Sequence, residues 1–203
     1  MKMSPLDRIL ILITGLLAAY QIVVGIDDLS TAPIIAYTIA FGVLLVAGLL
    51  LIILGFEALE SPVVVVVSTI IPLSLSLGLV WEHLPSLRNP YLLFAILGFI
   101  VVVFTRSAPT RAENRLPTLV IAIVHGVAGL TIFLLPIIIS LQGQTRLPFS
   151  LVGIGGALIG LGGLLLSFLK TGRPVLSRET ILKVMPGLLL LMTICFVAGF
   201  KYG

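Results

Sequence analysis

The amino-acid sequence predicts an all-α integral membrane protein with seven transmembrane helices that form one domain over residues 1–203. Two observations lead to this prediction. The first is composition: 59% of the residues are hydrophobic and 10% are charged, whereas a soluble domain carries about 25% charged residues to cover its surface. The second is length, because the apolar residues gather in seven stretches that reach or approach the roughly 17 to 25 residues a helix needs to cross a bilayer.

The first stretch follows the basic start MKMSPLDR and has the apolar core of a signal peptide. No small-residue cleavage site follows it, because the apolar run ends at Asp27 and Asp28. We therefore expect a retained span that also targets the chain to the membrane. The seven expected spans cover residues 9–26, 33–56, 62–81, 90–105, 117–141, 149–169 and 182–200.

The connectors between the stretches carry signals for the start of a helix. Ser61 and Asn89 each precede a proline, and proline is favoured in the first helical turn because its missing N–H needs no partner there. Three further stretches also begin with a proline. The five valines of residues 63–67 are therefore assigned to the third helix, although valine favours strands in soluble proteins. A membrane barrel would need segments of about ten residues with alternating polarity, and this chain lacks them.

Lysine and arginine are distributed unequally between the two sides of these spans, which sets the expected orientation. With the N-terminus inside, the inner segments hold Lys2, Arg8, Arg106, Arg111, Arg115, Lys170, Arg173, Arg178 and Lys183, and the outer segments hold Arg88, Arg146 and Lys201. The sequence thus predicts a cytoplasmic N-terminus and a C-terminus outside. We expect a prokaryotic plasma membrane as the location.

The first three and the last three spans share a weak pattern, which suggests a parallel repeat joined by the fourth helix. Pro72 of the third span and Pro186 of the seventh are 114 residues apart, and Pro33 and Pro148, at the starts of the second and sixth, are 115 apart. One linker helix makes both copies cross the membrane in the same direction. Pro72 and Pro186 should then kink their helices at similar depths.

His125 is the only ionisable residue well inside an expected span, and such residues are the first candidates for function in a membrane protein. It could ligate a haem or chlorin, relay protons or hydrogen-bond a quinone. The interpretation we favour is a neutral imidazole bonded within the bundle, with no cofactor. His83 lies at the outer end of the third span, too different in depth from His125 for the two to share one haem.

Two further groups of residues are candidates for binding or packing. A cation site on the outer face would require the first and third helices to be neighbours. Its residues would be Asp27, Asp28, Glu82 and His83. Gly156 and Gly160 have the small-xxx-small spacing that allows close packing between helices. The glycine-rich runs around them lie mid-span and follow no strand, so they do not indicate a phosphate site.

The sequence also argues against several functional classes. The single cysteine, Cys195, allows no internal disulfide and no cysteine metal cage. The scattered basic residues form no nucleic-acid surface, and the absence of a catalytic constellation predicts that the protein is not an enzyme.

We expect a non-catalytic structural or accessory subunit of a larger membrane complex, for which an electron-transfer assembly is one candidate. Its partners would be membrane lipids and other membrane subunits. The alternative is a small transporter or channel for an uncharged or apolar solute, built from the two repeats. The expected lining of its path is Ser68, Thr69, Ser74, Ser76, Thr193, Tyr20 and Gln21.

Overall fold

A computed structural model describes residues 3–27, 29–107, 116–170 and 176–203, and within them the chain is helical, with no strand. The long helices are α1 (Pro5–Val24), α2 (Thr31–Leu54), α3 (Pro62–His83), α4 (Arg88–Ser107), α5 (Leu116–Leu141), α6 (Ser150–Lys170) and α7 (Arg178–Tyr202). Short 3-10 helices are η1 (Gly55–Glu60), η2 (Pro85–Leu87) and η3 (Leu147–Phe149). The seven long helices have the length and apolar composition to cross a membrane, which confirms the predicted all-α class and the number of helices.

The first helix begins four residues earlier than expected because its N-terminus is capped. The Ser4 hydroxyl accepts a hydrogen bond from the Asp7 backbone N–H at 3.1 Å, and the Asp7 carboxylate accepts one from the Ser4 N–H at 2.8 Å. This reciprocal pair satisfies N–H groups that a helix end otherwise leaves open. At α7 the Ser177 hydroxyl accepts from the Thr180 N–H at 3.1 Å, and that helix also begins before its expected first residue.

Replacing Ser4 with alanine is expected to lower the free energy of unfolding by about 1 kcal/mol, the usual worth of a serine N-cap. Ser30→Ala is the matched control, because Ser30 precedes α2 without a side-chain cap bond. Thermal unfolding in one detergent measures both variants. Equal melting temperatures for the two variants would contradict a stabilising cap at Ser4.

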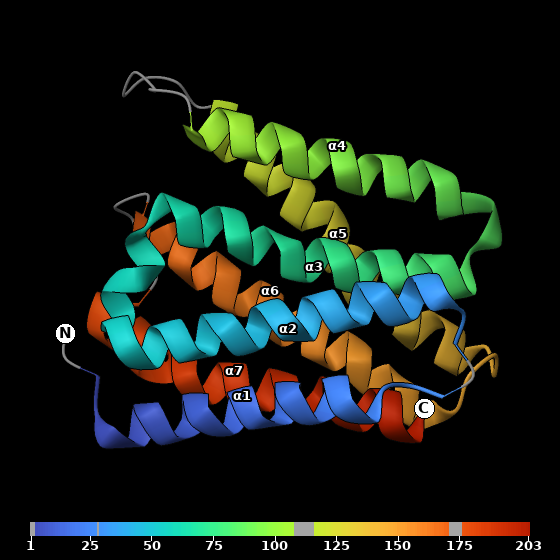
Figure 1. The fold of residues 1–203 in the computed structure, drawn as a ribbon, viewed down its shortest axis with the longest axis horizontal. Coiled ribbons are helices and arrows are strands. Elements are labelled where there is room, and N and C mark those ends of the chain that lie inside the picture. Colours follow the sequence, from blue (N-terminus) through green and yellow to red (C-terminus); the bar gives the residue numbers. More distant parts are fainter. Residues whose placement is uncertain (1–2, 28, 108–115, 171–175) are drawn as a thin grey trace.

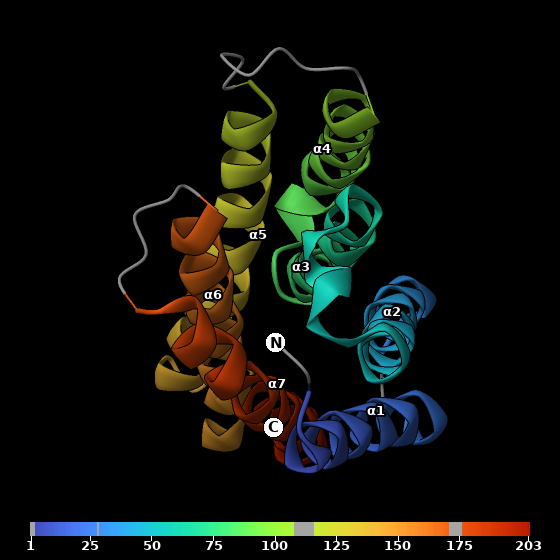
Figure 2. The same ribbon diagram turned by 90° about the vertical axis from the view of Figure 1, so that its left-hand side faces the viewer.

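The helices alternate in direction, and their ends gather at two faces of the bundle (Figure 1). We call the face where α1 begins the N-side and the face where α7 ends the C-side. Along the chain, α1 packs against α2 and α2 against α3, and in the same way α5 packs against α6 and α6 against α7. Contacts between α1 and α7 and between α3 and α5 close these six helices into a ring, seen from the N-side in Figure 2. Helix α4 packs outside this ring, on α3 and α5.

Aromatic side chains fill the C-side half of the ring. We call the aromatic cluster the set formed by Tyr37 and Phe41 of α2, Phe149 of η3, and Phe196 and Phe200 of α7, all of which are buried. Ring centroids are 4.7 Å apart for Tyr37 and Phe200, 6.5 Å for Phe41 and Phe196, and 6.0 Å for Phe149 and Phe200. Tilted and edge-on contacts of this kind are the favoured geometries of aromatic pairs. Because α2 belongs to the first three helices and α7 to the last three, the cluster joins the two halves of the ring.

Helix α4 is held on the ring at two places. Gly98 lies so close to α5 that a Cβ added there would be 3.2 Å from the side chain of Val124. At the C-side, Arg88 Nε donates a hydrogen bond to the carbonyl oxygen of Trp81 at 2.6 Å. The Arg88 guanidinium also lies 5.9 Å from the centre of the Trp81 ring, within the range of a cation–π contact. These contacts fix α4 over the junction between α3 and α5.

Pro72 and Pro186 both lie inside helices and are buried. Measured from the first residue of α3 or α7, they are about 15 Å and 12 Å along the helix axis at 1.5 Å per residue. Each proline removes one helical N–H, and the Ser76 hydroxyl donates to the Pro72 carbonyl oxygen at 2.6 Å. The two prolines therefore lie at comparable distances from their helix starts, while the repeat stays a prediction.

Candidate functional site

The histidine singled out in the sequence, His125, lies half-buried on α5, about 14 Å along the helix from its first residue. Its Nδ1 is 3.2 Å from the carbonyl oxygen of Ile121, one turn earlier in the same helix. His83 is the last residue of α3, and its ring centre is 5.3 Å from that of Phe149. The structure therefore places the two histidines at different depths and does not bring them together.

Replacing His125 with leucine is expected to change the free energy of unfolding by less than about 1 kcal/mol. The hydrogen bond that is lost is local to α5, and the net worth of one such bond is about 0.5–1.5 kcal/mol, which added apolar contact offsets. The measurement is reversible unfolding in detergent, with the visible absorption spectrum recorded for both proteins. A loss of several kcal/mol, or of an absorption band, would show that His125 holds a ligand or another helix.

The candidate cation site on the outer face is not assembled as expected. Its condition was that α1 and α3 be neighbours, but α2 lies between them, and α1 packs against α2 and α7. Asp27 is exposed, Glu82 and His83 are half-buried at the end of α3, and Asp28 lies outside the described residues. Among the residues that the structure describes, no three His, Cys, Asp or Glu side chains are grouped so that they could hold a metal ion.

The predicted packing glycines differ from each other. A Cβ added at Gly156 would lie 2.7 Å from the Ile132 side chain and 2.9 Å from the backbone nitrogen of Phe133, so α6 approaches α5 closely there. Gly160 is exposed, and an added Cβ would meet nothing within 4 Å. The prediction is therefore wrong for Gly160, because the two helices have separated one turn further along. Gly153 makes the second close approach instead, 2.5 Å from the carbonyl oxygen of Phe133.

The hydroxyls expected to line a solute path hydrogen-bond mostly within their own helices. Ser76 donates to the Pro72 carbonyl at 2.6 Å and Thr193 to the Leu189 carbonyl at 2.8 Å. Thr69 is fully buried, and Ser68 and Ser74 are half-buried. The remaining two members lie on α1, where Gln21 Nε2 donates to the Gly25 carbonyl at 2.9 Å and the Tyr20 hydroxyl accepts from Lys201 at 3.0 Å.

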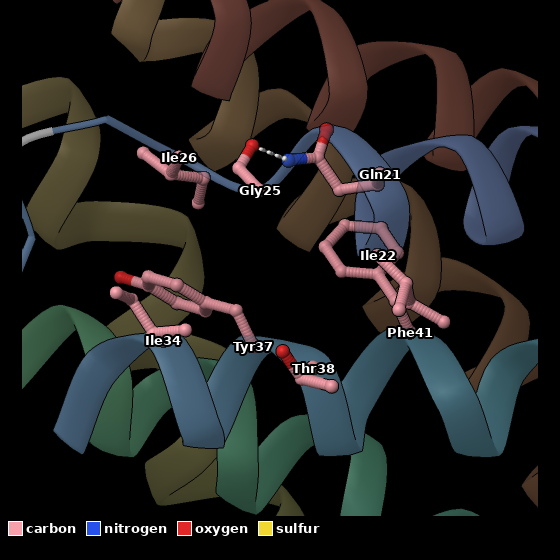
Figure 3. A pocket seen from close by; sticks show the side chains of 8 residues that line it. All are labelled: Gln21, Ile22, Gly25, Ile26, Ile34, Tyr37, Thr38 and Phe41. Atoms are coloured by element: carbon pink, nitrogen blue, oxygen red, sulfur yellow. Dashed lines mark hydrogen bonds between the residues drawn. The ribbon is translucent and has the colours of Figure 1, made fainter. Parts of the chain in front are cut away.

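One small pocket lies between α1 and α2 at the C-side (Figure 3). It is lined by Gln21, Ile22, Gly25, Ile26, Ile34, Tyr37, Thr38 and Phe41. Its volume of about 20 Å³ has room for one water molecule and for no larger ligand. The sequence analysis missed Tyr37 and Thr38, because an isolated tyrosine or threonine in an apolar span carries no spacing signal.

A second feature that the sequence did not indicate is the contact that joins α1 to α7 at the C-side. Lys201 Nζ lies 3.0 Å from the Tyr20 hydroxyl, 5.6 Å from the Tyr20 ring centre and 5.7 Å from that of Tyr202. An ammonium between aromatic rings is typical of a membrane interface, where long basic side chains reach the polar layer. The contact therefore closes the ring between its first and last helices.

These helices and side chains define a polytopic helical protein whose composition suits a membrane. Comparison of the chain with protein-family models, with curated proteins and with solved structures found no significant match. Its function has to follow from its own residues.

Proposed function

We propose that the protein is a non-catalytic structural or accessory subunit of a larger membrane complex, with an electron-transfer assembly as one candidate. The observation that carries this proposal is the filling of the space between the two halves. The aromatic cluster occupies its C-side half, and Ile132, Val152 and Met192, each at most 1% exposed, pack beside it. A bundle filled in this way suits a role in packing against other helices better than a role in passing a polar solute.

The outward surface of the bundle supports the same proposal. Large apolar side chains project from α4 and α5, among them Phe104 at 72% exposed, Leu93 at 58% and Leu130 at 58%. Such a surface contacts lipid chains or the helices of another subunit equally well, because van der Waals packing drives helix association in membranes. The partners that we propose are therefore lipids and other membrane subunits.

The test is photo-crosslinking in intact membranes, with a photoreactive residue at one exposed position at a time. Phe104 of α4, Leu130 of α5, Leu16 of α1 and Leu191 of α7 sample four sides of the bundle. A subunit should give a discrete protein adduct from at least one side, and isolation in mild detergent should recover the same partner in a fixed ratio. Lipid adducts alone from all four sides, with a monodisperse single chain after isolation, would contradict the proposal.

We propose as a second candidate a small transporter or channel for an uncharged or apolar solute. The observation that favours it is the pattern of helix contacts, in which the α1–α7 and α3–α5 junctions relate the first three helices to the last three. Buried prolines at similar positions in α3 and α7 fit two copies of one unit. Flux of uncharged solutes into proteoliposomes tests it, with Thr193→Val as a variant that keeps the side-chain shape and removes the hydroxyl. Absence of flux for every solute class tested would exclude this function.

We propose further that the N-side faces the cytoplasm of a prokaryotic cell. The support is the excess of lysine and arginine in the segments assigned to that side. Reporters that are active on only one side of the membrane, fused to each terminus in turn, test this orientation. Cytoplasmic activity at the C-terminus would reverse it.

A further inference from the structure

The glycines of α5 and α6 differ by depth in the bundle. Toward the C-side, Gly153 and Gly156 lie against the backbone of α5, with 2.5 Å from an added Cβ to the Phe133 carbonyl oxygen at Gly153. From the middle of the bundle to the N-side, Gly126 of α5 and Gly160 and Gly163 of α6 are exposed, and an added Cβ would meet nothing within 4 Å. The same two helices are thus in close contact at one end and apart at the other.

Figures 1 and 2 show the same divergence, with the N-side end of α5 beside α4 and well away from the N-side end of α6. The N-side half of α5 is packed on α4, where Val124 contacts Gly98. The N-side half of α6 leaves Leu161 at 48% exposed and Leu164 at 57%. Helix α5 is therefore held by α4 on this side, and α6 is the helix with room to move.

The point of closest contact has the properties of a pivot. Pro136 lies in α5 and has no N–H, so the Ile132 carbonyl one turn earlier loses its usual helical partner. Gly153 and Gly156 pack on this stretch of backbone, where Cα–H groups can approach the carbonyl oxygens. Glycine presents no side chain that would interlock with α5, so a change of crossing angle at this point breaks few contacts. The aromatic cluster holds the C-side ends together on one side of the pivot.

We propose that α6 hinges about the contact between Gly153, Gly156 and the backbone beside Pro136, so that its N-side half moves toward α5 and away from it. The structure is the open arrangement, with lipid chains between the two helices. In the closed arrangement the faces of Gly126 and of Gly160 and Gly163 come together, because residues without side chains let two helices approach. The hinge belongs to the fold and does not depend on whether the protein is a subunit or a transporter.

Spin-label distance measurements in lipid nanodiscs test the hinge. The N-side pair is Ile123→Cys in α5 with Leu164→Cys in α6, and the control pair at the C-side is Ile138→Cys with Ile154→Cys. All four positions are exposed, and Cys195→Ala removes the native thiol. The N-side pair should give two distances, or a distribution about twofold wider than the control pair, as expected for a collective helix motion. A single distribution as narrow as that of the control pair would overturn the hinge.

A variant then identifies the closing surface. Gly160→Leu with Gly163→Leu fills the open face, where nothing stands within 4 Å of an added Cβ, so the open arrangement accommodates the new side chains. The N-side pair should then retain only its longer distance, with the melting temperature kept close to that of the parent protein. A distribution that keeps its shorter distance in this variant would overturn the role of the glycine face.

Discussion

Replacing Gly156 with valine is expected to lower the free energy of unfolding by about 3 kcal/mol, at the upper end of the usual cost of overpacking. An added Cβ would lie 2.9 Å from both the carbonyl carbon of Ile132 and the backbone nitrogen of Phe133. Backbone atoms cannot rotate out of the way as a flexible side chain can. Helices α5 and α6 must therefore separate, and the contacts along their C-side halves weaken together.

Gly160→Val is the matched control for this change, since it introduces the same side chain one turn further along α6 into open space. Both variants lose the same helical glycine and gain the same β-branched residue, so differences in helix propensity cancel. Reversible unfolding in mixed micelles gives the two free energies. Equal values would mean that α5 and α6 do not pack through Gly156.

Replacing Phe196 with alanine is the second change with a large expected effect, a loss of about 3–5 kcal/mol, the usual cost of truncating a buried phenylalanine. The Phe196 side chain is 1% exposed, and its ring lies 6.5 Å from that of Phe41 and packs against Gly155. Removing the ring leaves a cavity between α2, α6 and α7 and weakens the junction between the two halves of the ring of helices.

Phe104→Ala is the control, because Phe104 of α4 is 72% exposed toward the surroundings of the bundle. Its truncation removes as many atoms without leaving an internal cavity. Unfolding followed by near-UV circular dichroism should show a much larger shift for the Phe196 variant. A comparable loss of stability at the two positions would indicate that the aromatic cluster is not the main contact between the halves.

The number of helices could be predicted from the sequence, because it depends on local properties alone. A run of apolar residues has only one regular structure that satisfies its backbone inside a bilayer without a partner strand. The helix ends were less accurate. The expected first span began at residue 9, but the Ser4–Asp7 capping pair starts α1 at Pro5 and brings a buried aspartate into it. Four polar or charged letters before an apolar run read as a connector unless the cap is recognised.

The candidate site depended on contacts that local patterns do not contain. The cation site assumed that α1 adjoins α3, and the order of helices around the ring places α2 between them. The glycine face assumed that spacing alone sets a packing surface, yet α5 diverges from α6 after Gly156 and leaves Gly160 open. Neither the ring order nor a crossing angle follows from the periodicity of one helix. Both are decided by how side chains of several helices fit at once.

The order of helices around the ring has a consequence for biosynthesis. Helices α1 to α3 contact their neighbours in the chain and can assemble while later helices are still being made, whereas the α1–α7 junction waits for the last helix. Until α7 arrives, Tyr37 and Phe41 have no Phe196 or Phe200 to cover them. A chain arrested before α7 therefore exposes an aromatic face within the membrane. Cellular quality control can recognise that face, so α7 serves as the signal that synthesis is complete.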